Sequence, residues 1–146
     1  MKNINIFLQE GALDAGALMA WLPYEKHGAQ VVFLGAVRGK NDGRMVTGIS
    51  FDIHQQLAVE TLKTIATEAI AASGEQDMRV YIAHAYGEIT VGGCCIAIGV
   101  TSAHRAAAYE ASRYIIEEVK TRVPIWKQEH YADKTTNWLP GHALAG

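Results

Sequence analysis

Apolar residues recur along the chain with two different periods, and these periods predict its secondary structure. Strands are indicated where apolar side chains alternate or run together, and helices where they recur every three or four residues. The predicted strands cover residues 3–9, 30–37, 46–53, 79–85 and 93–100, with a further strand after Pro124. The predicted helices cover residues 14–21, 56–72 and a long segment from about residue 103 to Pro124.

The order of these elements is strand, helix, strand, strand, helix, strand, strand, helix, strand. The chain contains no internal repeat, low-complexity tract or linker. This mixture predicts a two-layer domain of the α+β or α/β type. Because 146 residues suit one domain with a single sizeable core, we expect one domain over residues 1–146.

The composition narrows the possible partners. The chain is 49% hydrophobic and 19% charged with a net charge of −2, which is ordinary for a globular protein. Neither a nucleic-acid coat nor a polybasic membrane surface is indicated, so any affinity for anions must come from local clusters of cations. No apolar stretch is long enough to cross a bilayer, and residues 1–6 alternate like a strand without a signal-peptide core. We therefore expect a cytoplasmic protein.

The junction between the strand at residues 93–100 and the long helix is the first candidate site. Thr101 and Ser102 are residue types that cap helices, and they precede His104 and Arg105. A helix start presents unpaired N–H groups and the positive end of the helix dipole, and two cationic side chains there favour a bound anion. The alternative is that Arg105 is a solvated surface residue and His104 is hydrogen-bonded locally.

The end of the same helix carries two lysines. Lys120 lies in the predicted last turn and Lys127 follows Pro124, where the chain must leave the helix. The bend would bring the two ammonium groups together, and lysines near one another or near Arg38 disfavour each other's charged form. Such lysines are better proton donors or nucleophiles near neutral pH. The alternative is that Lys120 complements the helix dipole and Lys127 is a solvated strand residue.

Residues 38–44 form a third candidate, because three cations and several turn residues lie between two apolar strands. This pattern predicts a flexible basic loop, in which Arg38 at the strand end would hold phosphate; the alternative is a solvated hairpin connection.

Cys94 and Cys95 are adjacent, so a strand points them to opposite faces. They fit neither a disulfide framework nor a metal site with His84, and are interpreted as packing residues.

Four segments of the chain resemble the large, catalytic subunit of molybdopterin synthase. They are residues 100–105, residues 120–129, residues 33–38 with Asn41 and Gly43, and residues 84–88 with Gly92. They occur in the family's order and cover nearly the whole chain. The resemblance implies an α+β fold that is α/β hammerhead-like, in two layers with a small additional β subdomain, and a homodimeric core.

The same resemblance implies the chemistry. The substrate would be cyclic pyranopterin monophosphate, and sulfur would come from the thiocarboxylated C-terminal glycine of a small ubiquitin-like subunit, forming the dithiolene of molybdopterin. The enzyme would be a heterotetramer around the homodimer, with no cofactor, no metal, no nucleic acid and no membrane as partner. Arg38, His104 and Arg105 are assigned to substrate binding, and Lys120 and Lys127 to catalysis.

Two features depart from the family pattern. His54 stands near where the family has tyrosine, and the tail after Trp138 lacks a basic residue. One alternative function is a non-catalytic homodimeric protein that binds the small subunit or a phosphorylated metabolite; the presence of both lysines weighs against it. An unrelated phosphate-binding regulator would explain His104 and Arg105 but not the lysines. The enzymatic interpretation requires the cations to surround one cavity.

Overall fold

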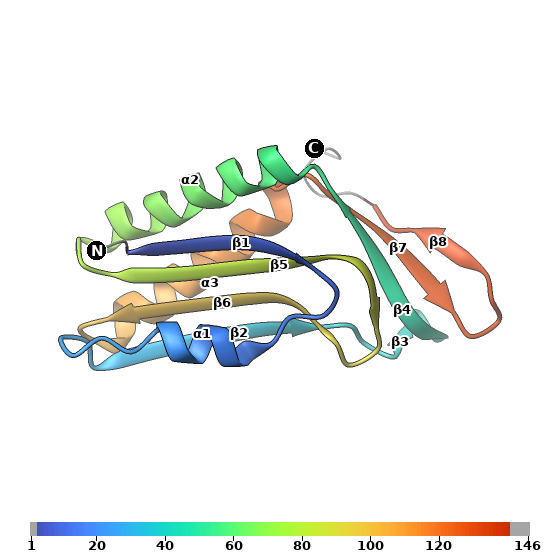
Figure 1. Ribbon diagram of the computed structural model, residues 1–146, viewed down its shortest axis with the longest axis horizontal. Helices are drawn as coiled ribbons and strands as arrows, with labels where there is room; N and C mark the ends of the chain where they lie inside the picture. The colour runs from blue at the N-terminus through green and yellow to red at the C-terminus, as the bar shows by residue number, and fades with distance from the viewer. Residues whose placement is uncertain (1–2, 141–146) are drawn as a thin grey trace.

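The computed structural model describes residues 3–140, which form three helices and eight strands (Figure 1). In chain order the elements are β1 (Ile4–Glu10), α1 (Ala15–Trp21), β2 (Ala29–Ala36), β3 (Lys40–Asn41), β4 (Arg44–Ile53), α2 (Gln55–Ser73), β5 (Arg79–Thr90), β6 (Cys94–Ser102), α3 (Arg105–Arg122), β7 (Ile125–Tyr131) and β8 (Thr136–Trp138). The expected α+β class is confirmed. Most of the tail after Trp138 lies outside the described residues.

The long strand β5 connects two parts of the sheet. Its first part pairs in parallel with β1 on one side and antiparallel with β6 on the other, and β6 in turn pairs with β2. Its last residues pair with β4, which continues to β7 and β8. Figure 1 shows β4, β7 and β8 set at an angle across one end of the other strands. This outer part matches the small additional β region that the resemblance implied.

The helices cover the first part of the sheet on both faces. On β5, Val80 and Ile82 point to the core beneath α2 and α3, whereas Tyr81 and Ala83 point to the core that contains Leu18 of α1. This alternation follows from the two-residue period of a strand.

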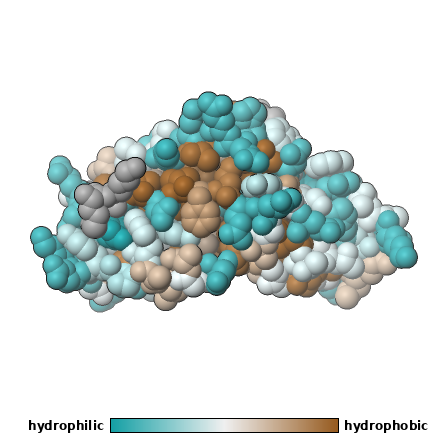
Figure 2. Space-filling model, in the orientation of Figure 1, coloured by the Kyte–Doolittle hydropathy of each residue, from teal (hydrophilic) through white to brown (hydrophobic). Residues whose placement is uncertain are grey.

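On the face seen in Figure 2, a hydrophobic area lies where β1 runs beside α2. No helix in the described part of the chain is long and apolar enough to span a membrane.

Strand β5 is longer than predicted. The sequence indicated an end at residue 85 and a turn over residues 86–92, but β5 continues to Thr90. Gly87 has φ of 80°, a conformation that glycine adopts without steric cost, and it pairs with Phe51 of β4. The glycine therefore redirects the strand onto a new partner, and the turn to β6 is confined to the residues around Gly92.

The predicted cap of α3 is wrong. Thr101 and Ser102 belong to β6, because their backbones still pair with Arg79 and Ala29 of the neighbouring strands. The N-cap position is His104, whose side chain makes no capping hydrogen bond. Instead, the Ser102 hydroxyl donates to the His104 carbonyl oxygen at 2.5 Å.

The predicted flexible basic loop is an ordered hairpin. Strands β3 and β4 pair through Asn41 and Arg44, and the two residues between them, Asp42 and Gly43, have φ of 50° and 77°. Positive φ at both central positions is the geometry of a tight hairpin turn, for which Asp-Gly is a preferred pair. The short strand β8 was not predicted.

Candidate functional site

A cavity of about 260 Å³ lies where α3 ends and where β2 passes into the β3–β4 hairpin. Four cationic side chains line it: Arg38, Lys40, Lys120 and Lys127. Among the remaining lining residues are the apolar side chains Phe33, Phe51, Ile96, Ile116, Val119, Ile125 and Leu139. The cavity therefore combines an apolar wall with clustered positive charge, an arrangement that favours a ligand with an anionic group and a planar or apolar body.

Pro124 and the register of β7 bring the two catalytic candidates together. Lys120 lies in the last turn of α3, and the chain leaves the helix at Val123, which has extended geometry before Pro124. Strand β7 then pairs with β4 so that Lys127 lies opposite Phe51. Leu139 donates its backbone N–H to the Lys127 carbonyl oxygen at 2.8 Å, so the segment after β8 holds this point of β7 against the cavity.

The end of α3 is fixed to α2 by Arg122. Its guanidinium donates to both carboxylate oxygens of Glu68, at 2.6 and 3.1 Å, and to Glu118 at 3.0 Å. Tyr114 also donates to Glu68, at 2.6 Å. These bonds hold the pKa of Glu68 at about 2, mainly because Arg122 binds its charged form. Arg122 thus anchors the helix turn that carries Lys120.

The environment of Lys127 lowers the pKa of its ammonium group. Its side chain is half-buried, and burial lowers its pKa from the ordinary value of a lysine, with the positive charge of Lys120 as the second cause. Both effects disfavour an ammonium ion. Lys127 consequently releases a proton more readily than a solvated lysine does.

His84 on β5 is a cavity residue that sequence reasoning did not assign a role. Its ring packs edge-on against Phe51, and its Nδ1 lies 2.7 Å from the Ala85 carbonyl oxygen. A carbonyl can only accept, so Nδ1 carries the proton and Nε2 keeps its lone pair. Burial, opposed by this hydrogen bond and reinforced by Lys127 and Lys120, lowers the pKa of His84 to about 4. The only signal in the sequence was its position in a segment resembling the family.

Two further cavity residues are Cys95, whose thiol is uncharged, and Glu129, whose carboxylate accepts hydrogen bonds from its neighbours. Cys95 lines the cavity and its thiol donates to the Gly35 carbonyl oxygen at 3.4 Å. Burial raises the pKa of this thiol, so it is a protonated side chain rather than a thiolate at neutral pH. Glu129 is buried and accepts hydrogen bonds from Asn41 and from the Tyr131 hydroxyl. Both groups belong to the wall of the cavity.

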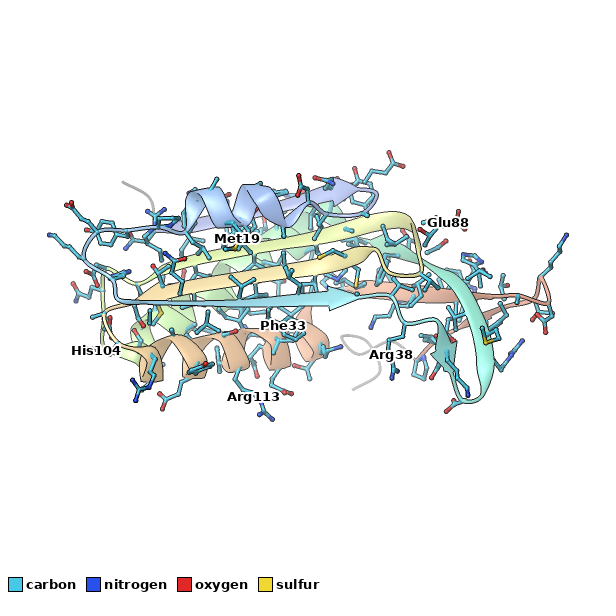
Figure 3. All side chains as sticks on the ribbon, turned by 90° about the horizontal axis from the view of Figure 1, so that it is seen from below. Met19, Phe33, Arg38, Glu88, His104 and Arg113 are labelled. Atoms are coloured by element: carbon cyan, nitrogen blue, oxygen red, sulfur yellow. The ribbon has the colours of Figure 1, made fainter. Side chains whose placement is uncertain are left out.

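The structure does not bring His104 and Arg105 to this cavity within one chain. They lie at the start of α3, and Figure 3 shows His104 at one end of the molecule and Arg38 far from it, past the other end of α3. Arg105 and Lys120 are fifteen positions apart on the helix, which corresponds to about 22 Å along the axis. Of the five predicted site residues, Arg38, Lys120 and Lys127 share the cavity. The roles assigned to all five stay predictions.

The fold and the cavity together define an α+β protein with a lysine-bearing, cation-lined site. A family model described as "MoaE protein" matches residues 8–122. A curated molybdopterin synthase catalytic subunit from Synechococcus elongatus is 46% identical over 120 residues, which cover 82% of this chain and 72% of that relative.

Solved structures of molybdopterin synthase proteins superpose on this chain. Molybdopterin synthase from Staphylococcus aureus superposes with a TM-score of 0.83 at 29% identity, covering 95% of this chain and 98% of that one. A complex of subunits 1 and 2 of the molybdopterin-converting factor from Helicobacter pylori superposes with a TM-score of 0.72 at 28% identity, covering 91% and 88%. The chain belongs to the MoaE family.

Proposed function

We propose that this chain is the catalytic subunit of a molybdopterin synthase. It transfers sulfur from the thiocarboxylated C-terminal glycine of a small ubiquitin-like subunit to cyclic pyranopterin monophosphate, and so builds the dithiolene of molybdopterin. The observation that carries the proposal is the shared cavity of Arg38, Lys120 and Lys127 beside the neutral ring of His84. The chain acts in the cytoplasm as one domain over residues 1–146.

Phosphate binding is assigned to Arg38, and orientation of the thiocarboxylate and proton transfer are assigned to the two lysines. Arg38 lies on the exposed rim of the cavity, where a guanidinium forms paired hydrogen bonds with phosphate oxygens. Lys120 and Lys127 orient the thiocarboxylate and move protons while a carbon–oxygen function is replaced by carbon–sulfur. The lowered pKa of Lys127 makes its ammonium group a readier proton donor than that of a solvated lysine.

The small subunit and a second copy of this chain complete the assembly, a heterotetramer around a homodimer. The relative from Helicobacter pylori is itself a complex of two kinds of subunit. Strand β2 pairs only with β6 among the described strands, and its exposed Phe33 forms an apolar strip with the exposed Tyr109 of α3. This apolar strip supports a homodimer contact, and it leads to the cavity because Phe33 lines both.

His104 and Arg105 contact the substrate from the second chain. In their own chain the length of α3 keeps Arg105 away from Lys120. In the proposed twofold dimer the helix start of one chain would lie beside the cavity of the other. The pterin phosphate would then be bound by Arg38 of one chain and by His104 and Arg105 of its partner.

The experiment is a reconstituted reaction. The purified chain is mixed with thiocarboxylated small subunit and cyclic pyranopterin monophosphate, and the dithiolene product is measured. Product must form in amounts that follow the thiocarboxylate supplied. Binding of the small subunit or the pterin without any product would overturn the proposal and identify a binding protein instead.

A further inference from the structure

A second cluster of charged side chains lies at the opposite end of α3 from the cavity. His27 belongs to the segment before β2, and Glu75 and Asp77 belong to the turn between α2 and β5. One nitrogen of the histidine and one oxygen of each carboxylate lie within 4.8 Å of one another. Two segments distant in the sequence therefore present three metal-ligand atoms to one point.

The imidazole of His27 is buried although it faces these carboxylates. Its side chain is 1% exposed, whereas that of Asp77 is 53% exposed. Nδ1 lies 2.7 Å from the Thr101 hydroxyl oxygen, which fixes the ring orientation. Nε2 lies 3.4 Å from Asp77 Oδ1, yet it makes no hydrogen bond. A buried ring nitrogen without a hydrogen-bond partner is costly unless another group binds it.

The contact with Thr101 suggests which atom is available. If Nδ1–H donates to the Thr101 hydroxyl, Nε2 carries a lone pair that faces two carboxylates, and this arrangement is repulsive without a cation between them. Histidines that bind metals commonly donate their other ring N–H to an oxygen atom, which fixes the tautomer. The alternative tautomer would place a proton between Nε2 and Asp77, but the observed geometry is not that of a hydrogen bond.

We propose that Nε2 of His27 and the carboxylates of Glu75 and Asp77 bind a divalent transition-metal ion of the Zn²⁺ type. One nitrogen and two carboxylates are ligands that Zn²⁺ accepts, and the two negative charges balance the ion. The exposed Asp77 side chain is free to close the remaining distance. Mg²⁺ and Ca²⁺, which prefer oxygen ligands, bind this site more weakly.

The bound ion would join three parts of the fold. Glu75 accepts a hydrogen bond from the Ala103 backbone N–H at 2.9 Å, and its own N–H is held by Ser73 Oγ at 2.9 Å. The ion therefore fixes the segment before β2, the α2–β5 turn and the start of α3, where His104 and Arg105 lie. It acts on stability and on the placement of the helix start, and the sulfur-transfer chemistry takes place elsewhere.

The test is a Zn²⁺ titration of the metal-stripped chain, purified without a histidine tag and followed by calorimetry. One ion per chain is expected, together with a rise in melting temperature when Zn²⁺ is added. His27→Gln and Asp77→Asn must each lose this binding. Thr101→Val, which keeps the side-chain shape but removes the oxygen bonded to Nδ1, weakens Zn²⁺ binding roughly 10- to 100-fold.

His130 provides the matched control. Its Nε2 lies 3.7 Å from Glu88, a histidine–carboxylate pair outside the metal-ligand cluster, so His130→Gln must leave the stoichiometry and affinity unchanged. If His27→Gln does not fold, the Asp77→Asn and Thr101→Val variants still decide the result. Absence of Zn²⁺ binding, or an equal loss in His130→Gln and Asp77→Asn, would overturn the proposal and leave His27 and Asp77 as an ion pair.

Discussion

The amide nitrogen of Asn41 lies 3.0 and 3.1 Å from the two carboxylate oxygens of Glu129. Asn41 belongs to β3 and Glu129 to β7, so this contact joins the hairpin after Arg38 to the strand that carries Lys127. Tyr131 donates to the same carboxylate at 2.7 Å. The buried charge of Glu129 thus has two donors, and the basic hairpin is held over the cavity.

Replacing Asn41 should destabilise the protein. Asn41→Ala leaves the buried carboxylate with one donor fewer, which costs about 1–3 kcal/mol of the free energy of unfolding. Urea denaturation measures the change. Lys40→Ala on the same strand is the control, since an exposed side chain contributes no more than about 0.5 kcal/mol. Equal stability of the two variants would show that the Asn41–Glu129 contact does not hold the hairpin.

His84 should make the stability depend on pH. Its pKa is about 4 in the folded protein and 6.5 ordinarily, so between these values the unfolded chain binds a proton that the folded chain does not. The stabilising effect of the neutral ring is complete above pH 6.5 and is lost as the pH falls toward 4. Between pH 7 and pH 5 the free energy of unfolding should fall by about 2 kcal/mol from this group.

Urea denaturation at the two pH values tests this prediction. His84→Gln should remove that part of the pH dependence. His54→Gln should keep it, because His54 is exposed and caps α2 by accepting the Leu57 N–H at 3.2 Å. The prediction is wrong if the His84 variant retains the full slope.

Most of the fold followed from local patterns, but the site followed only in part. Alternating and helical periods placed the main elements within a few residues, and Pro124 correctly predicted the bend between Lys120 and Lys127. The cap at Thr101 was misassigned because residue type alone does not reveal that β6 still has pairing partners there. Strand β8 is too short to show a period.

The separation of His104 and Arg105 from Lys120 could have been predicted from the length of the helix. The predicted helix was long enough to separate its start from Lys120, so a single chain was never able to use both ends at one cavity. The protonation state of His84 depends on burial and on the Ala85 carbonyl, which arise from tertiary packing. Neither the burial of this ring nor its hydrogen bond to the Ala85 carbonyl is encoded in a local sequence motif.

The influence of Lys120 on Lys127 can be measured directly. Burial is the main cause of the lowered pKa of Lys127, and the charge of Lys120 adds to it. Lys120→Ala should therefore raise the pKa of Lys127 while leaving it below 10.5. Titration of the Lys127 amine by NMR measures this shift. Lys63→Ala on α2 should cause none, and an unchanged pKa in Lys120→Ala would show that the two ammonium groups do not interact.

The proposed sharing of one substrate between two chains predicts complementation. Arg38→Ala should raise KM, because the variant loses a charged hydrogen bond that contributes about 1.5–3 kcal/mol to the binding free energy. Arg105→Ala should be impaired as well. In a mixed dimer of the two variants, one cavity would receive both intact arginines, so activity should rise well above that of either homodimer. Mixed dimers as impaired as the homodimers would contradict a shared site.

The decisive measurement is dithiolene formation by Lys120→Ala in the reconstituted reaction, after confirming that the variant is folded and binds the small subunit. Loss of product with an intact assembly is the expected result, because Lys120 lines the cavity together with Arg38 and Lys127. Undiminished turnover by the variant would contradict the role of this cavity in sulfur transfer.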